Sequence, residues 1–115
     1  MYRSLSISFA LLLSACATTL PSSSFYQGNS TTYGNDNILR NDVVSQIKQI
    51  EKLGYDCKQI ESVTPKILDV KQVNGLNHVQ ELWSVKACGK THSYPVTLRE
   101  SATGGVDFTV TFKKQ

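Results

Sequence analysis

The strongest constraint on the fold is a change of hydrophobic period near Gly54. Before it, apolar residues recur at steps of four, four, three and three, which is the stripe of an amphipathic helix. They are Leu39, Val43, Ile47, Ile50 and Leu53. After Gly54 the period falls to two, as in half-buried strands. The pattern predicts a helix with Asn37 or Asn41 at its start and Gly54 as its left-handed end, followed by strands.

The segments after Gly54 read as strands separated by turns. Two alternate clearly, "ELWSVKA" at 81–87 and "VDFTVTF" at 106–112, while "YPVTL" at 94–98 matches and "ILDVKQV" at 67–73 is weaker. A short run from Tyr55 to Ser62, stopped by Pro65, would add an edge strand. Turn signals separate these segments at spacings typical of antiparallel hairpins. They are Asn74-Gly75, Cys88-Gly89 and Gly104-Gly105.

The predicted fold class is α+β, with one N-terminal amphipathic helix packed on an antiparallel sheet of four to five strands. The apolar side chains of one sheet face are expected to contact the helix. They are Trp83, Val85, Phe108, Val110 and Phe112. Because proline lacks the N–H that a central strand uses, Pro95 is expected at the first paired position of its strand or at a bulge.

Residues 1–15 have the three parts of a secretory leader: one basic residue, Arg3, an apolar run from Leu5 to Leu13, and small residues. The run is far shorter than the roughly 20 residues that span a bilayer. Leu13-Ser14-Ala15-Cys16 resembles the lipobox of bacterial lipoproteins. That resemblance implies cleavage before Cys16 and acylation of its sulfur and new N-terminus, so that fatty acids anchor the chain. Since no aspartate follows Cys16, it also implies delivery to the outer membrane.

Residues 17–37 are dominated by Ser, Thr, Asn and Gly, and such a composition buries little apolar surface. The sequence therefore predicts three regions: a lipoprotein signal peptide at 1–15, the acylated Cys16 with a flexible tether at 16–37, and a single small domain at 38–115. In an alternative interpretation the aromatic residues of the tether, Phe25, Tyr26 and Tyr33, form a strip that binds a partner.

Cys57 and Cys88 remain after export to a compartment that oxidises thiols, and an even pair in a small secreted domain predicts a disulfide. Closing a loop of about 31 residues stabilises a fold by roughly 3.7 kcal/mol in the chain-entropy model. A redox pair normally has Cys-x-x-Cys spacing, and structural zinc takes four closely spaced ligands. The remaining alternative is a thiol and imidazole pair of Cys88 with His92, within "CGKTH".

No combination of nucleophile, base and orienting group stands out, so the chain is predicted not to be an enzyme, with no catalytic residue, metal site or cofactor. Gly89-Lys90-Thr91 lacks the earlier glycine and the following helix of a phosphate loop. His78 and His92 are expected to be surface residues. Glu81 shares the apolar parity of Trp83, which places it either beyond the cover of the helix or in a binding site.

The charge of the chain argues against a nucleic-acid partner. There are 12 basic and 9 acidic residues, a net charge of +3, and Arg3 in the leader is one of the 12. The rest of the chain is nearly balanced, and Lys48, Glu51 and Lys52 mix the two signs at neighbouring positions. Nucleic-acid binders gather Lys and Arg on one face instead. No nucleic acid is therefore expected among the partners.

"QELWSVKACGKTHSYPVTL" followed by "GGVDFTV", roughly residues 80 to 110, resembles a group of small proteobacterial lipoproteins without assigned activity. The resemblance implies a shared fold and localisation and supplies no catalytic residue. The expected function is a non-enzymatic interaction module, anchored at the outer membrane, that binds an envelope or secreted protein. The alternative is an envelope-protective inhibitor or ligand-binding lipoprotein, similar to small membrane-bound lysozyme inhibitors in size, anchor and disulfide.

Overall fold

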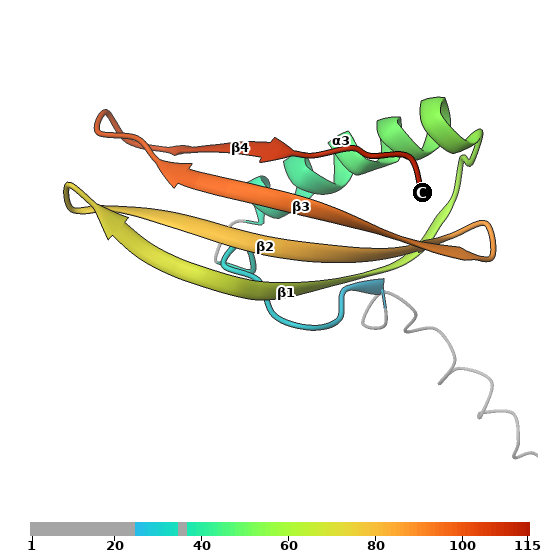
Figure 1. Cartoon of the computed structure of the whole chain (residues 1–115), viewed down its shortest axis with the longest axis horizontal. Helices are drawn as coiled ribbons and strands as arrows, with labels where there is room; N and C mark the ends of the chain where they lie inside the picture. Colours follow the sequence, from blue (N-terminus) through green and yellow to red (C-terminus); the bar gives the residue numbers. More distant parts are fainter. Residues whose placement is uncertain (1–24, 35–36) are drawn as a thin grey trace, which may run out of the picture.

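The computed structural model describes residues 25–34 and 37–115. They contain one long helix, α3 (Ile38–Tyr55), and four strands, β1 (Ile60–Val73), β2 (Leu76–Ala87), β3 (Lys90–Glu100) and β4 (Val106–Val110). The strands pair antiparallel in the order β1-β2-β3-β4 and the helix lies against one face of this sheet (Figure 1). The α+β class is confirmed with four strands. The predicted N-terminal position of the helix is wrong, because α3 follows a segment, residues 25–34, that lies along β1.

The 25–34 segment corrects the prediction of a flexible tether. Tyr26 forms a parallel bridge with Val63, and the N–H groups of Gln27 and Asn29 donate to the carbonyls of Val63 (2.9 Å) and Pro65 (3.1 Å). Phe25 and Tyr26 are half-buried and pack against the core of the domain, and the Tyr26 ring lies edge-on to both Phe25 and Tyr33. Partner binding by these aromatic residues stays a prediction. The leader, Cys16 and the rest of the tether up to residue 24 lie outside the described residues.

Strand β1 contains two segments that were predicted to be separate strands. The run ending at Ser62 and the run 67–73 form one continuous strand through Pro65. The N and C=O of a strand residue point to the same side, and the Pro65 carbonyl accepts from Asn29 on the outer edge. The missing N–H of Pro65 therefore costs the β1–β2 ladder nothing, because β1 is an edge strand.

Pro95 lies inside β3, opposite Leu82, and not at a first paired position or a bulge. Its carbonyl accepts from the N–H of Thr111 (2.9 Å), one residue beyond the end of β4 at Val110. The proline nitrogen therefore faces the point where pairing with β4 stops. The pairing between β2 and β3 continues in regular register past Pro95, which explains how an inner strand accommodates it.

The helix keeps most of its predicted stripe and departs from it at its end. Val43 and Ile47 are fully buried, but Leu53 is 81% exposed, and buried Glu51 takes the inward position after Ile47. Asn37 precedes the helix, which continues to Tyr55, where Asp56 (φ 55°) provides the left-handed end that was expected at Gly54. A side chain at Gly54 would instead meet the ring of Phe112, whose Cζ would lie 2.8 Å from the added Cβ.

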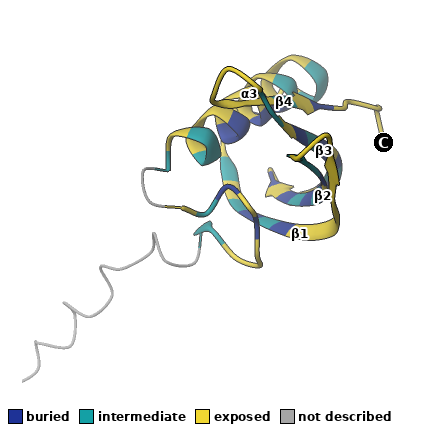
Figure 2. Cartoon of the chain, turned by 90° about the vertical axis from the view of Figure 1, so that its left-hand side faces the viewer, coloured by how far each residue is buried: buried dark blue, intermediate teal, exposed yellow. Residues whose placement is uncertain are grey.

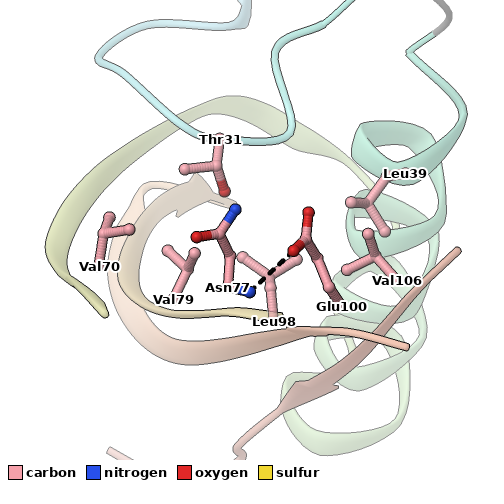
Figure 3. A pocket seen from close by; sticks show the side chains of 8 residues that line it. All are labelled: Thr31, Leu39, Val70, Asn77, Val79, Leu98, Glu100 and Val106. Carbon is pink, nitrogen blue, oxygen red and sulfur yellow. Dashed lines mark hydrogen bonds between the residues drawn. The ribbon is translucent and has the colours of Figure 1, made fainter. Parts of the chain in front are cut away.

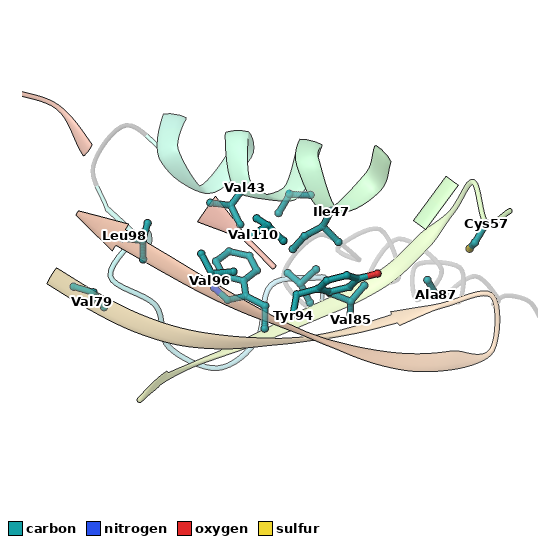
Figure 4. Packing of buried hydrophobic residues seen from close by; sticks show 13 residues of the cluster. Val43, Ile47, Cys57, Val79, Val85, Ala87, Tyr94, Val96, Leu98 and Val110 are labelled. Carbon is teal, nitrogen blue, oxygen red and sulfur yellow. The ribbon is translucent and has the colours of Figure 1, made fainter. Parts of the chain in front are cut away.

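The core fills the space between α3 and the concave side of the sheet (Figure 4). Trp83, Val85 and Val110 are buried as predicted, and Phe108 is half-buried. Phe112 departs from the prediction: it lies beyond the end of β4 and is 42% exposed. The other core residues of the strands also face the helix side of the sheet. They are Val63, Val79, Ala87, Tyr94, Val96 and Leu98.

A disulfide between Cys57 and Cys88 confirms the predicted pairing (S–S 2.03 Å). It ties the segment after α3 to the two-residue turn between β2 and β3, and we call this the disulfide end of the sheet. The Gln115 side chain closes the same end, accepting from the backbone N–H of Ser93 (3.1 Å) and donating to its carbonyl (2.7 Å). The opposite end, with the turns between β1 and β2 and between β3 and β4, is the hairpin end.

Candidate functional site

Glu81, in the middle of β2, is 1% exposed and holds the 25–34 segment on the sheet. Its Oε1 accepts from the Ser30 hydroxyl (2.7 Å) and from Trp83 Nε1 (2.9 Å). Its Oε2 accepts from the N–H (2.8 Å) and the hydroxyl (2.6 Å) of Thr31. The partners of Glu81 lie on the 25–34 segment and on β2, so this segment covers its carboxylate.

His92 is also buried, contrary to its predicted surface position. Its Nδ1 lies 2.8 Å from Glu51 Oε2, the Tyr94 hydroxyl donates to the same oxygen, and its ring stacks on Tyr55 (centroids 3.7 Å apart). Glu51 is fully buried, and its Oε1 has no hydrogen-bond partner among the described residues. The sulfur of Cys88 is held in the disulfide, so the thiol and imidazole pair does not form.

The second histidine, His78, lies on the sheet. His78 is half-buried on β2, in register with Lys71 of β1 and Arg99 of β3. Within residues 25–34 and 37–115, no group of three or more His, Cys, Asp or Glu side chains is placed to hold a metal ion. Among the same residues, no helix has both the length and the apolar character needed to cross a membrane.

A hollow of about 220 Å³ opens at the hairpin end of the sheet (Figure 3). Five aliphatic side chains contributed by α3 and all four strands line it: Leu39, Val70, Val79, Leu98 and Val106. Its polar lining comprises Thr31, Asn77 and Glu100, with the N–H of Asn77 donating to Glu100 Oε1 (2.8 Å). Such an apolar concavity with a few polar groups is the usual form of a ligand or side-chain pocket.

The outer edge of β1 is free over its second half. The 25–34 segment pairs with this edge at Val63 and Pro65, and no described residue pairs with it from Lys66 to Val73. This free stretch exposes large apolar side chains, each 37–53% accessible: Ile67, Leu68, Val70 and Val73. Figure 2, which faces the hairpin end, shows the exposed character of β1 at this margin. The register shift between Ile67 and Asp69 makes Leu68 a bulge residue.

The free edge and the hollow form one site, because they share Val70. Beyond the bulge, Val70 pairs with buried Val79 and so belongs to the concave face, where it lines the hollow. The two-residue turn at Asn74-Gly75 places Val73 and Leu76 in the last hydrogen-bonded pair of the β1–β2 ladder. Backbone groups alternate along a strand, so those of Val70 and Gln72 point outward. The sequence showed no local signal for this site, since an edge depends on strand order.

The phenols of half-buried Tyr33 and buried Tyr94 make the stability of the fold sensitive to alkali. Burial raises the pKa of Tyr33 to about 12 against the opposing effect of Arg40, and burial, then the hydrogen bond to Glu51, raises the pKa of Tyr94 further. Unfolded tyrosines ionise near pH 10. The unfolded state therefore loses these protons first, and the stabilisation present below about pH 10 falls as pH rises towards 12. Denaturant titrations should show this decline, and Tyr94→Phe should make it shallower.

Comparisons with protein families, with characterised proteins and with solved structures found no match for this chain. The lipobox resemblance of Leu13-Ser14-Ala15-Cys16 and the resemblance across residues 80 to 110 thus remain predictions. The geometry of the β1 edge and the hollow is the basis for a functional proposal.

Proposed function

We propose that this chain is a non-enzymatic interaction module, held at the outer membrane through acylated Cys16, that binds an extended segment of an envelope or secreted protein along the free edge of β1. The observation that carries this proposal is the stretch from Lys66 to Val73, which combines an outer edge left unpaired by the described residues with four exposed apolar side chains. A bound strand would extend the sheet by main-chain hydrogen bonds, with side-chain pockets giving specificity.

The first half of the same edge already binds a strand-like segment of the chain itself. Gln27 and Asn29 donate to the carbonyls of Val63 and Pro65, two residues apart, as an added strand does. A partner strand beyond Pro65 would continue this row of hydrogen bonds towards the hairpin end. The proposed site is thus continuous with an interface present within the fold.

The hollow and the charges of β1 provide selectivity. Because Val70 lines the hollow, a strand beside it would direct an apolar side chain towards the hollow's mouth. Lys66, Asp69 and Lys71 place charges of both signs on the edge, and charged edges discourage indiscriminate pairing between sheets. An extended segment with alternate apolar residues and matching charges is therefore the favoured partner.

The test compares two substitutions at Gln72. Gln72→Pro removes one outward N–H without removing a β1–β2 hydrogen bond, whereas the matched control Gln72→Thr keeps that N–H. With tagged protein solubilised from membranes in detergent, wild type and Gln72→Thr should recover a stoichiometric protein partner, and Gln72→Pro should recover about ten-fold less. Equal recovery by both variants, or no recovered partner, would contradict strand addition at this edge.

The hollow favours a second candidate, a ligand-binding or inhibitory lipoprotein. Its aliphatic lining and its volume of about 220 Å³ suit a small apolar group, with Glu100 and Asn77 as polar contacts. If no partner is recovered but the purified protein inhibits added lysozyme, the inhibitory alternative is favoured. If instead it retains a small apolar molecule that Val79→Trp displaces, ligand binding is favoured.

A further inference from the structure

A second apolar surface lies at the disulfide end, remote from the β1 edge. Leu53, 81% exposed, and Phe112, 42% exposed, flank a groove of about 330 Å³ between α3 and the segment that follows β4. Ile50 and Gly54 line the same groove. Leu53 and Phe112 are thus large apolar side chains that remain exposed to solvent. We call Ile50, Leu53 and Phe112 the α3 patch.

Lysines surround the α3 patch. Lys48, Lys52 and Lys58 line a neighbouring groove that shares Gln49 with the patch groove, and two further lysines, Lys113 and Lys114, directly follow Phe112. Acidic side chains do not offset this charge. In the interval 48–58, Glu51 is buried against His92 and Tyr94, which leaves Asp56 as the exposed carboxylate. The patch therefore combines an apolar centre with a basic rim.

We propose that the α3 patch docks on the surface of an anionic lipid bilayer. Leu53 and Phe112 would enter the boundary between headgroups and acyl chains, as the apolar face of an interfacial helix does. The surrounding lysines would contact negatively charged headgroups. The basic rim, in which Asp56 is the one exposed carboxylate between residues 48 and 58, favours an anionic surface over a second copy of this nearly balanced chain.

The position of Cys16 makes even a weak contact of this kind effective. This step rests on the proposed anchor at Cys16. The nine peptide steps from Cys16 to Phe25 reach at most about 30 Å when fully extended. A domain held within that distance meets the membrane at a high effective concentration, so a patch of modest affinity orients it.

The experiment uses the expected mature chain, beginning at residue 16, with Cys16→Ser so that no acyl chain contributes. Cosedimentation is measured with vesicles of phosphatidylcholine alone and of equal parts phosphatidylcholine and phosphatidylglycerol. We expect binding to the anionic vesicles to be about ten-fold tighter and to weaken at high salt. Leu53→Ser and the double variant Lys52→Glu and Lys114→Glu should each reduce it by about ten-fold.

The controls place matched changes elsewhere on the surface. Ile38→Ser removes another exposed apolar residue of α3, at the hairpin end, and Lys71→Glu reverses a charge on β1; both should leave vesicle binding unchanged. Equal binding to both vesicle types, no binding to either, or a change of oligomeric state with Leu53→Ser would overturn the proposal. These results concern the patch alone, whereas release of Cys16→Ser protein from cell membranes tests the anchor.

Discussion

Replacing Glu81 with leucine is expected to destabilise the fold by about 3–5 kcal/mol, because it leaves several buried neutral donors without an acceptor at about 1–3 kcal/mol each. Leucine leaves Trp83 Nε1 without its acceptor and removes both contacts that hold Thr31. Small domains have only about 5–15 kcal/mol of stability in total. Chemical denaturation of wild type and variant would measure the loss.

The same substitution should release the 25–34 segment. Hydrogen exchange or limited proteolysis should show faster opening at Ser30 and Thr31 than in the wild type, because Glu81 is their shared acceptor. Asp107→Leu is the matched control, since Asp107 is an exposed sheet carboxylate on β4 and its loss should cost about 0.5 kcal/mol or less. If Glu81→Leu left both stability and exchange unchanged, the assigned role of Glu81 would be wrong.

Glu51→Leu is the second large change, with an expected loss of about 3–5 kcal/mol, because it breaks a buried hydrogen-bond network and leaves two buried groups without their acceptor. It deprives His92 Nδ1 and the Tyr94 hydroxyl of a common acceptor inside the core. Glu51→Gln keeps an acceptor and should cost less, about 1–3 kcal/mol. Thermal or denaturant unfolding of the purified variants would give both values.

A double-mutant cycle with Tyr94→Phe separates this network from simple packing. Removing the phenol hydroxyl should cost less in the Glu51→Leu background than in the wild type, because its acceptor is already gone. Additive losses would show that Glu51 and Tyr94 act independently. Replacing a whole buried polar group by apolar residues can be neutral, so the triple variant Glu51→Leu, His92→Leu and Tyr94→Phe should recover part of the loss.

The periodic parts of the fold could be predicted from the sequence because burial repeats there along one element. Val43 and Ile47 follow the helical stripe, and Trp83 and Val85 follow the strand alternation, as the structure confirms. The disulfide could be predicted because two cysteines remain once Cys16 is assigned to the lipobox, and the predicted export would expose them to an oxidising compartment. Pattern reasoning fails at Leu53, because the inward position after Ile47 belongs to Glu51, whose partners lie on β3.

The polar contacts that organise the rest join residues far apart in the chain. Ser30 and Glu81 are 51 positions apart, and no local composition distinguishes a spacer from a segment held by such a bond. A partial signal was present in strand parity: His92 shares the parity of Tyr94 and Val96, as Glu81 shares that of Trp83. A polar residue at a strand position that faces the core is therefore better predicted to be a buried hydrogen-bond donor or acceptor.

The two ends of the sheet are fastened unequally, and this has a kinetic consequence. The disulfide, the contact of Glu51 with His92 and the hydrogen bonds of Gln115 to Ser93 all lie at the disulfide end. The turns near Gly75 and Gly104 close the hairpin end without a cross-link. Along β2, amide protons should therefore exchange at graded rates, slowest near Ala87 at the disulfide end and fastest near Leu76 at the hairpin end. A molecule that binds at the hairpin end would slow the exchange of the fast amides first. Hydrogen exchange can therefore detect binding before the bound molecule has been identified.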